Sequence, residues 1–196
     1  MPSLFSTDAS QVALTQLTRL AQRRPDTAGM LEKALAGRLQ GVSQDALWVA
    51  VETGDPIGRV LAWQLEAHAT PDLLETIVGQ CDRLRFRSSV PLREVALVAT
   101  RKVLDACRAA GTAPTEARRA RLATLANNVS GRLKDLGRRE EAVAAIEEAV
   151  AVCRELSRRR PEEFLPDLAM SLHNRSGRLS DVGRREEALA AIEDAG

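Results

Sequence analysis

Apolar residues in the second half of the chain recur at intervals of three and four positions. The first such run consists of Leu122, Leu125, Val129, Leu133 and Leu136. In an α-helix this spacing places all their side chains on one face. Gly137 follows the run and can adopt the positive φ that ends a helix. The pattern predicts an amphipathic helix, which we name helix A.

A second apolar run begins after Gly137. It consists of Ala142, Ile146, Ala149, Cys153 and Leu156. The charged residues 138–141 precede it, as is typical of the start of a helix. Pro161 and Pro166 interrupt the pattern after Arg160, so we expect the chain to turn there before the next helix. The second run predicts helix B, which forms an antiparallel pair with helix A.

This pair is repeated along the chain. The segment from Asn128 to Ala142 recurs at residues 174–188, an offset of 46 positions. The same offset aligns Ala96 with Ala142, so a more divergent copy contributes at least its helix B. The prediction is therefore a repeat region at residues 91–196. It comprises helix B of a divergent copy at 91–111, a copy at 114–160 and a truncated copy at 161–196.

The repeat resembles the tetratricopeptide repeat family. The residues that carry the resemblance are Gly137 through Ala142, Ile146, Ala149, small Ser130 and apolar Leu133. The period exceeds the usual 34 residues by about twelve, and no Trp or Tyr occupies the large aromatic positions of helix A. The longer helices are similar to kinesin-light-chain-like repeats and to bacterial arrays joined to ATPase or protease domains. The resemblance implies an all-α, right-handed superhelical solenoid of antiparallel helix pairs.

Residues 1–90 do not show the repeat, although they also predict helices. Helix-start signals occur at Thr7-Asp8, Pro25-Asp26, Ser43, Asp55-Pro56 and Thr70-Pro71-Asp72. The apolar residues expected in the first two helices are Val12, Leu14, Leu17 and Leu20, then Met30, Leu31, Leu35 and Leu39. The fifth helix is expected to include Leu84, and Trp48 and Trp63 are expected to anchor the core. This half is either a set of degenerate repeats that form a helical cap, which we favour, or a small helical adaptor domain.

Composition excludes several classes of protein. The chain has 28 basic and 27 acidic residues, so no global charge attracts it to nucleic acid or to a membrane. It has no secretory signal pattern and no apolar stretch that could span a bilayer, which predicts a cytoplasmic protein. The abundant Arg and Ala indicate a GC-rich bacterial genome.

Catalytic and metal-binding motifs are absent from the sequence. It has no phosphate-binding loop, no nucleophile elbow and no zinc-protease motif. No pattern in the sequence brings titratable groups of different types together, as an active site requires. Cys81, Cys107 and Cys153 are widely spaced, with only two histidines in the chain, so we expect reduced thiols and no metal. We therefore predict that the chain is not an enzyme and uses no cofactor.

Binding residues are expected on the inner wall of the solenoid. A helix pair cannot bury its own apolar face, so pairs stack and leave a concave wall formed mainly by A helices. The resemblance places on this wall Thr124, Asn127, Asn128, Gly131, Lys134, Met170, His173, Asn174, Gly177 and Ser180. The Asn residues suit the backbone of a peptide or a docked helix, or else they bridge neighbouring A helices. Gly131 and Gly177 are expected to leave room for a partner backbone.

These features predict a protein–protein interaction scaffold that binds a peptide or helix, as part of a larger bacterial regulatory or signalling protein. One alternative is a self-assembly module, because Leu189 and Ile192 would be uncovered at the C-terminal end and would favour weak homo-oligomers. RNA binding through Arg158-Arg159-Arg160 is another alternative, which the Glu pairs after Arg139 and Arg185 disfavour. The B helices are expected to present a solvated charged surface.

Overall fold

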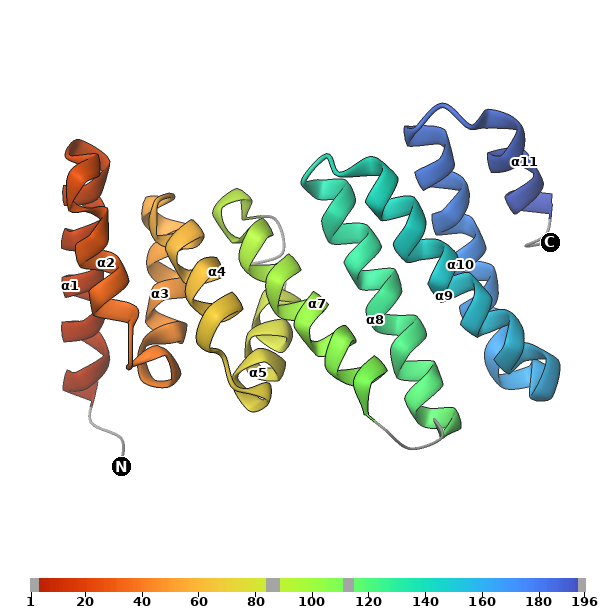
Figure 1. The fold of residues 1–196 in the computed structure, drawn as a ribbon, viewed down its shortest axis with the longest axis horizontal. Helices are drawn as coiled ribbons and strands as arrows, with labels where there is room; N and C mark the ends of the chain where they lie inside the picture. The colour runs from red at the N-terminus through yellow and green to blue at the C-terminus, as the bar shows by residue number, and fades with distance from the viewer. Residues whose placement is uncertain (1–3, 84–88, 111–114, 194–196) are drawn as a thin grey trace. The chain divides into compact units, whose positions relative to one another are not determined.

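The computed structural model describes residues 4–83, 89–110 and 115–193 (Figure 1). Within these ranges the chain forms α-helices and two short 3₁₀ helices, with no β-strand. Most helices pack against neighbours in the chain within each compact part, as α8 does against α9 and α9 against α10. The all-α helical-repeat class is therefore confirmed, whereas the right-handed course of the solenoid stays a prediction. None of the described helices combines the length and apolar character needed to cross a bilayer.

The chain divides into two compact units, Met1–Lys102 and Val103–Gly196. We call them unit 1 and unit 2 and describe each by itself. The division falls within helix α7, Arg93–Ala109, which covers most of the helix B predicted at residues 91–111. The sequence predicted that the repeats begin at residue 91, and this boundary between a cap and the repeats stays a prediction.

Unit 1 consists of α-helices of different lengths, two 3₁₀ helices and the first part of α7. In chain order they are α1 Leu4–Arg23, η1 Pro25–Thr27, α2 Ala28–Leu35, α3 Leu39–Thr53, α4 Ile57–His68, α5 Pro71–Cys81 and η2 Val90–Leu92. The Thr70 side chain caps α5, since its Oγ1 accepts a hydrogen bond of 3.3 Å from the backbone N–H of Leu73. Leu84, expected in this helix, lies outside the described residues.

Three helix starts predicted in unit 1 are wrong. The first helix begins at Leu4, so residues 7 and 8 lie inside it and do not cap it. The segment from Pro25 forms a 3₁₀ turn before α2 begins at Ala28. Helix α3 begins at Leu39, which was expected in the second helix, so Ser43 lies inside α3 and does not start it. Pro25 does mark a turn of the chain, but it begins a short 3₁₀ helix and not the α-helix itself.

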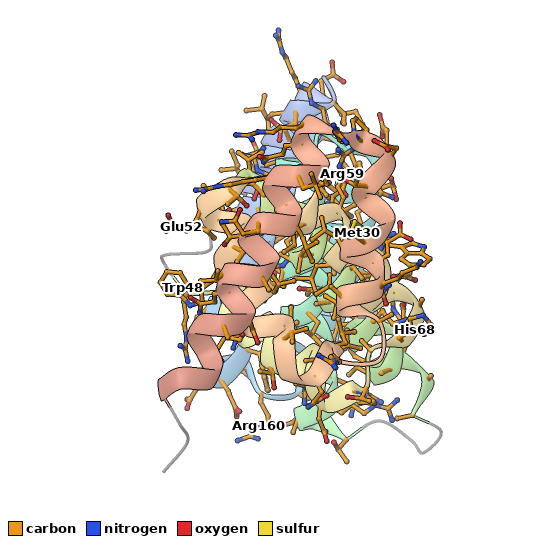
Figure 2. All side chains as sticks on the ribbon, turned by 90° about the vertical axis from the view of Figure 1, so that its left-hand side faces the viewer. Met30, Trp48, Glu52, Arg59, His68 and Arg160 are labelled. Carbon is orange, nitrogen blue, oxygen red and sulfur yellow. The ribbon has the colours of Figure 1, made fainter. Side chains whose placement is uncertain are left out.

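Helix α4 buries one apolar face, but the tryptophan predicted to anchor the core lies on another face. Ile57, Leu61 and Leu65 have no exposed surface, because their spacing of four keeps them on the inner face. Trp63 lies on the opposite face of that helix and is 56% exposed. Trp48 on α3 is half-buried and emerges beside α1 (Figure 2). Neither tryptophan is a buried core anchor.

Helix α1 shows a similar shift of face. Leu14, Thr18 and Ala21 are buried, and their spacing of four and three defines the inner face. Val12 and Leu20, which the sequence predicted in the core, are exposed instead. A small residue and a hydroxyl therefore take core positions, with the Thr18 hydroxyl donating to the Leu14 carbonyl at 2.7 Å.

Unit 2 contains two helix pairs that follow the last part of α7. The first pair is α8 Glu116–Asp135 with α9 Arg139–Arg159, and the second is α10 Pro161–Asp181 with α11 Arg185–Glu193. The members of each pair run antiparallel and lie side by side (Figure 1). Helices α8 and α10 are the predicted A helices, and α9 and α11 are the predicted B helices.

The turns inside the two pairs have the same construction. Gly137 has φ of 74° and Gly183 has φ of 82°, so both adopt the left-handed conformation expected of a helix end. After each glycine an arginine donates two hydrogen bonds to a glutamate three residues later, as in Arg184 and Glu187. The hydrogen bonds from Arg184 lower the pKa of Glu187.

The turn between the pairs is shorter than the prolines suggested. Helix α9 ends at Arg159 and α10 begins at Pro161, so one residue, Arg160, connects them. Pro161 occupies the first helical position, where its missing N–H costs nothing. Pro166 lies inside α10, contrary to the prediction that it lies in the turn. Its ring is on the exposed side of the helix, near its start.

An apolar cluster joins the second pair to the first. Val143 on α9 packs in one cluster with Leu179 on α10 and with Ala188 and Ala191 on α11. All four side chains are at most 4% exposed. Helix α10 packs against both α9 and α11, so the cluster links the two pairs through α10.

Gly58, in the first turn of α4, permits a close contact within unit 1. A Cβ atom at this position would lie 2.3 Å from the backbone carbonyl oxygen of Pro91 in η2. That distance is far below van der Waals contact, and backbone atoms cannot move aside as a flexible side chain can. The absence of a side chain at Gly58 therefore lets η2 pack against α4.

We expect Gly58→Ala to lower the free energy of unfolding by about 1–3 kcal/mol, because overlap with backbone outweighs the better helix propensity of Ala. Denaturant titration followed by circular dichroism measures the effect. Gly79→Ala is the matched control, since Gly79 is an exposed helical position with no atom within 4 Å of the added Cβ. It should leave stability unchanged or raise it, and an equal loss in both variants would contradict the argument.

Candidate functional site

The predicted partner-binding residues all lie on the two A helices of unit 2. Thr124, Asn127, Asn128, Gly131 and Lys134 are on α8, and Met170, His173, Asn174, Gly177 and Ser180 are on α10. Helix α9 packs against both α8 and α10, and these two also contact each other. The structure therefore brings the predicted residues onto adjacent helices. We call these ten residues the A-helix surface.

Exposure separates this surface into two groups. The side chains on α10 at Met170, His173 and Ser180 are exposed, and Gly177 is exposed between them. Their spacing of three, four and three makes them one face of that helix. On α8, Thr124 and Lys134 are exposed. Half-buried positions follow the line where α8 and α10 meet: Asn127, Asn128, Gly131 and Asn174.

Polar side chains bridge α8 and α10 along this line. The Asn174 side-chain amide donates a hydrogen bond of 2.9 Å to Oδ1 of Asn127. One turn further, Nε of Arg178 donates to the hydroxyl oxygen of Ser130 at 3.1 Å. At the end of the helices, Nζ of Lys134 lies 3.9 Å from a carboxylate oxygen of Asp181, which makes an ion pair. We call these contacts the A-helix bridges.

The asparagines were expected either to bind a partner or to bridge neighbouring A helices, and one pair forms a bridge. Asn127 and Asn174 bond to each other, as the helix-bridging alternative expected. Asn128 stands at the repeat position of Asn174 and has no such partner on α10 among the described contacts. Gly131 lies under the Arg178 guanidinium, which would be 3.9 Å from a Cβ there. Gly177 has no atom within 4 Å of a Cβ position, and the expectation that both glycines leave room for a partner backbone stays a prediction.

Sequence reasoning missed three bridge residues, Ser130, Arg178 and Asp181, as candidates for this region. Ser130 and Arg178 lie in the repeated segment, and their recurrence at the same repeat position was the available signal. Their pairing joins residues of different copies, and no pattern within one copy reveals it. Arg178 is half-buried, and its guanidinium donates to the hydroxyl oxygen of Ser130.

The B helix α9 is less freely solvated than the sequence predicted. Two guanidinium nitrogens of Arg108 donate to the two carboxylate oxygens of Glu148, and that hydrogen bonding raises the pKa of Arg108. Glu155 accepts from Arg119 on α8 and from Arg159 on α9. Both carboxylates therefore link α9 to neighbouring helices, although such exposed pairs contribute little stability individually.

The cysteines do not form a site within the described part of the chain. All three are free, and no group of three or more His, Cys, Asp or Glu side chains there could hold a metal ion. Cys81 and Cys153 are buried, while Cys107 is half-buried. Burial raises the pKa of the Cys153 thiol, and its sulfur lies 3.7 Å from the Ser171 hydroxyl oxygen.

A surface hollow of about 460 Å³ opens at the turn between α9 and α10. It is lined by Arg160, Pro161, Glu162 and Glu163. Arg160 makes ion pairs with Glu116 at the start of α8 and with Glu163, so its charge is already compensated. None of the residues of the A-helix surface lines this hollow.

Comparison with known families gives one match within unit 2. The family model described as Tetratricopeptide repeat matches residues 122–157, which include most of α8 and nearly all of α9. Members of this repeat family are protein–protein interaction modules without catalytic activity of their own. No curated protein matches the chain. The long period and the similarity to kinesin-light-chain-like repeats stay predictions, because the matched segment lies within one copy.

The hydrogen bond between Asn127 and Asn174 should contribute to the stability of unit 2. In a double-mutant cycle of Asn127→Ala and Asn174→Ala, we expect a coupling energy of about 0.5–1.5 kcal/mol, measured by chemical unfolding. The control cycle combines Asn128→Ala with Asn174→Ala, whose side chains form no bond, and should show no coupling. Zero coupling in the first cycle would show that the bridge does not hold the two helices.

Proposed function

We propose that this chain, which contains a tetratricopeptide repeat at residues 122–157, is a scaffold that binds a protein partner on the A-helix surface. The observation that carries the proposal is the exposed face of α10. Met170 is 52% exposed there. It lies between the exposed polar residues Asp167 and His173 on the same face of the helix. A large flexible apolar side chain at such a position suits contact with a partner.

The polar residues around Met170 support recognition of a peptide or helix backbone. His173 and Ser180 are exposed on the same face, and Asn128 is half-buried on α8. An Asn side chain can donate and accept hydrogen bonds together, as a peptide group requires. Gly177 has no atom within 4 Å of a Cβ position, so a partner backbone can approach α10 closely there.

The opposite side of the pairs offers less for a partner to bind. The exposed positions of α9 include Ala144 and Ala151, which are small, and Glu147, which faces Arg175 at 3.8 Å. Glu148 and Glu155 already pair with arginines. A partner on α9 would have to break these ion pairs without gaining an apolar anchor. A role within a larger bacterial regulatory protein of the cytoplasm is part of the same proposal.

A photo-crosslinking residue can test which side of unit 2 contacts a partner. The residue replaces Met170 or Ala151, and each variant is expressed in the native host. Any protein that becomes crosslinked to the chain is then identified and purified. We expect a specific product from position 170 and none from position 151. The purified partner then allows affinities to be measured directly.

We expect the double variant Met170→Glu with Asn128→Ala to weaken that affinity at least tenfold, which corresponds to about 1.4 kcal/mol. The glutamate would bury a charge in the interface, and the alanine would remove a side chain that hydrogen-bonds to the partner backbone. Ala144→Glu with Ala151→Glu is the matched control on α9 and should leave affinity unchanged. Circular dichroism checks that both variants fold. The opposite result, with loss of affinity in the α9 variant alone, would place the site on the B helices.

A further inference from the structure

We propose that unit 1 is a stack of helix pairs in which each pair packs only against adjacent pairs, and not an adaptor domain with one shared core. In the part of unit 1 that the structure describes, the pairs are α1 with α2, α3 with α4, and α5 with the first part of α7. The sequence left both possibilities open, because residues 1–90 show no repeat. Side-chain hydrogen bonds between the helices carry the proposal.

Three hydrogen bonds fix how α1 and α3 lie beside each other. Nε2 of Gln11 donates to Oδ1 of Asp45 at 3.0 Å. Nε2 of Gln22 donates to the backbone carbonyl oxygens of Thr53 and Asp55 at 2.7 and 2.9 Å. Residues early in α1 thus meet residues early in α3, and residues late in α1 meet the end of α3. The two helices therefore run in the same direction, with bonded residues 31–34 positions apart.

The second helices of the pairs show the same arrangement. On α4, Nε2 of Gln64 lies 3.5 Å from the backbone carbonyl oxygen of Glu32 on α2, which is 32 residues earlier. On α7, Nζ of Lys102 donates to the backbone carbonyl oxygen of Glu66 on α4 at 2.6 Å, across 36 residues. Gln64 is 2% exposed, so its amide lies inside the boundary between two pairs. Helices α2, α4 and α7 therefore follow one another as second members of successive pairs.

The third pair joins the stack with a similar step. The hydroxyl of Thr70, which caps α5, donates to Oε1 of Gln40 at the start of α3 at 3.4 Å, across 30 residues. These contacts in unit 1 thus join residues 30–36 positions apart. The usual period of a tetratricopeptide repeat, 34 residues, falls within that range. The A-helix bridges of unit 2 span 47 or 48 residues, so the two units differ in step.

The two members of each pair lie on different sides of unit 1. Figure 2 shows Trp48 and Glu52 of α3 on one side of this unit, and Met30 of α2 and His68 of α4 on the other. Helix α3 packs against α1, and α4 packs against α2. The first helices therefore form one layer and the second helices form another.

Packing in unit 1 is confined to adjacent pairs. Helices α1 and α2 pack against each other and against α3 or α4, and within the described residues neither makes a comparable contact with α5. Helix α3 contacts both α1 and α5, so it stands between them. Figure 1 shows the pairs in this order along the unit. Loss of one interface should therefore loosen the pairs that share it and leave the pair beyond them intact.

Native-state hydrogen exchange of the whole 196-residue chain, followed by mass spectrometry of its peptides, tests the stack. Leu14→Ala removes a side chain of α1 that is 4% exposed. We expect amide exchange to become faster by about tenfold or more in α1 and α2, because truncation of a buried leucine weakens the packing of that pair. Exchange in α5 should change by less than about twofold, since α3 and α4 separate α5 from the altered pair.

Leu74→Ala is the matched control, because Leu74 is 5% exposed on α5. It should accelerate exchange in α5 and leave α1 within about twofold of the unmodified chain. Circular dichroism checks that both variants fold. If Leu14→Ala does not fold, Leu14→Val removes less volume and allows the same comparison. Equal acceleration of α1 and α5 in either variant would overturn the stack and indicate one shared core, and so would loss of the fold in both Leu14 variants.

Discussion

The constraint on which unit 2 depends is that a single helix pair cannot bury its own apolar face. Val143 on α9 is buried in one apolar cluster with Leu179 of α10 and two alanines of α11. The alanines matter because larger side chains would hold α11 further away. Burial of the first pair in unit 2 therefore requires the second.

Some residues of the A helices hydrogen-bond between α8 and α10, and the same helices are proposed to bind a partner. Asn127 and Asn174 hydrogen-bond to each other across the line between α8 and α10, and Arg178 reaches Ser130 beside them. A side chain engaged in such a bridge must give up its partner before it can bind a ligand, which costs free energy. Met170, His173 and Gly177 carry no bridge of this kind in the described part of the chain. Recognition is therefore proposed at those positions, beside a line of contacts that holds the helices in place.

Prediction from sequence succeeded where structure is local and was less accurate elsewhere. The helix ends at Gly137 and Gly183 follow from the conformational freedom of glycine, and the buried face of α9 follows from spacing alone. In α1, by contrast, Thr18 and Ala21 are buried while Val12 and Leu20 are exposed. Hydrophobicity did not identify that face, because what α1 packs against was not visible in its own sequence.

The sequence by itself determined the helix pairs, their turns and the A helices on which candidate binding residues lie. These features depend on periodicity and on residues near each other in the chain. Only the tertiary structure decided which asparagines bridge helices, which tryptophan is exposed and that Pro91 lies against Gly58. Each of these depends on segments distant in sequence, whose distance and orientation are set by packing. Periodicity within one helix contains no information about them.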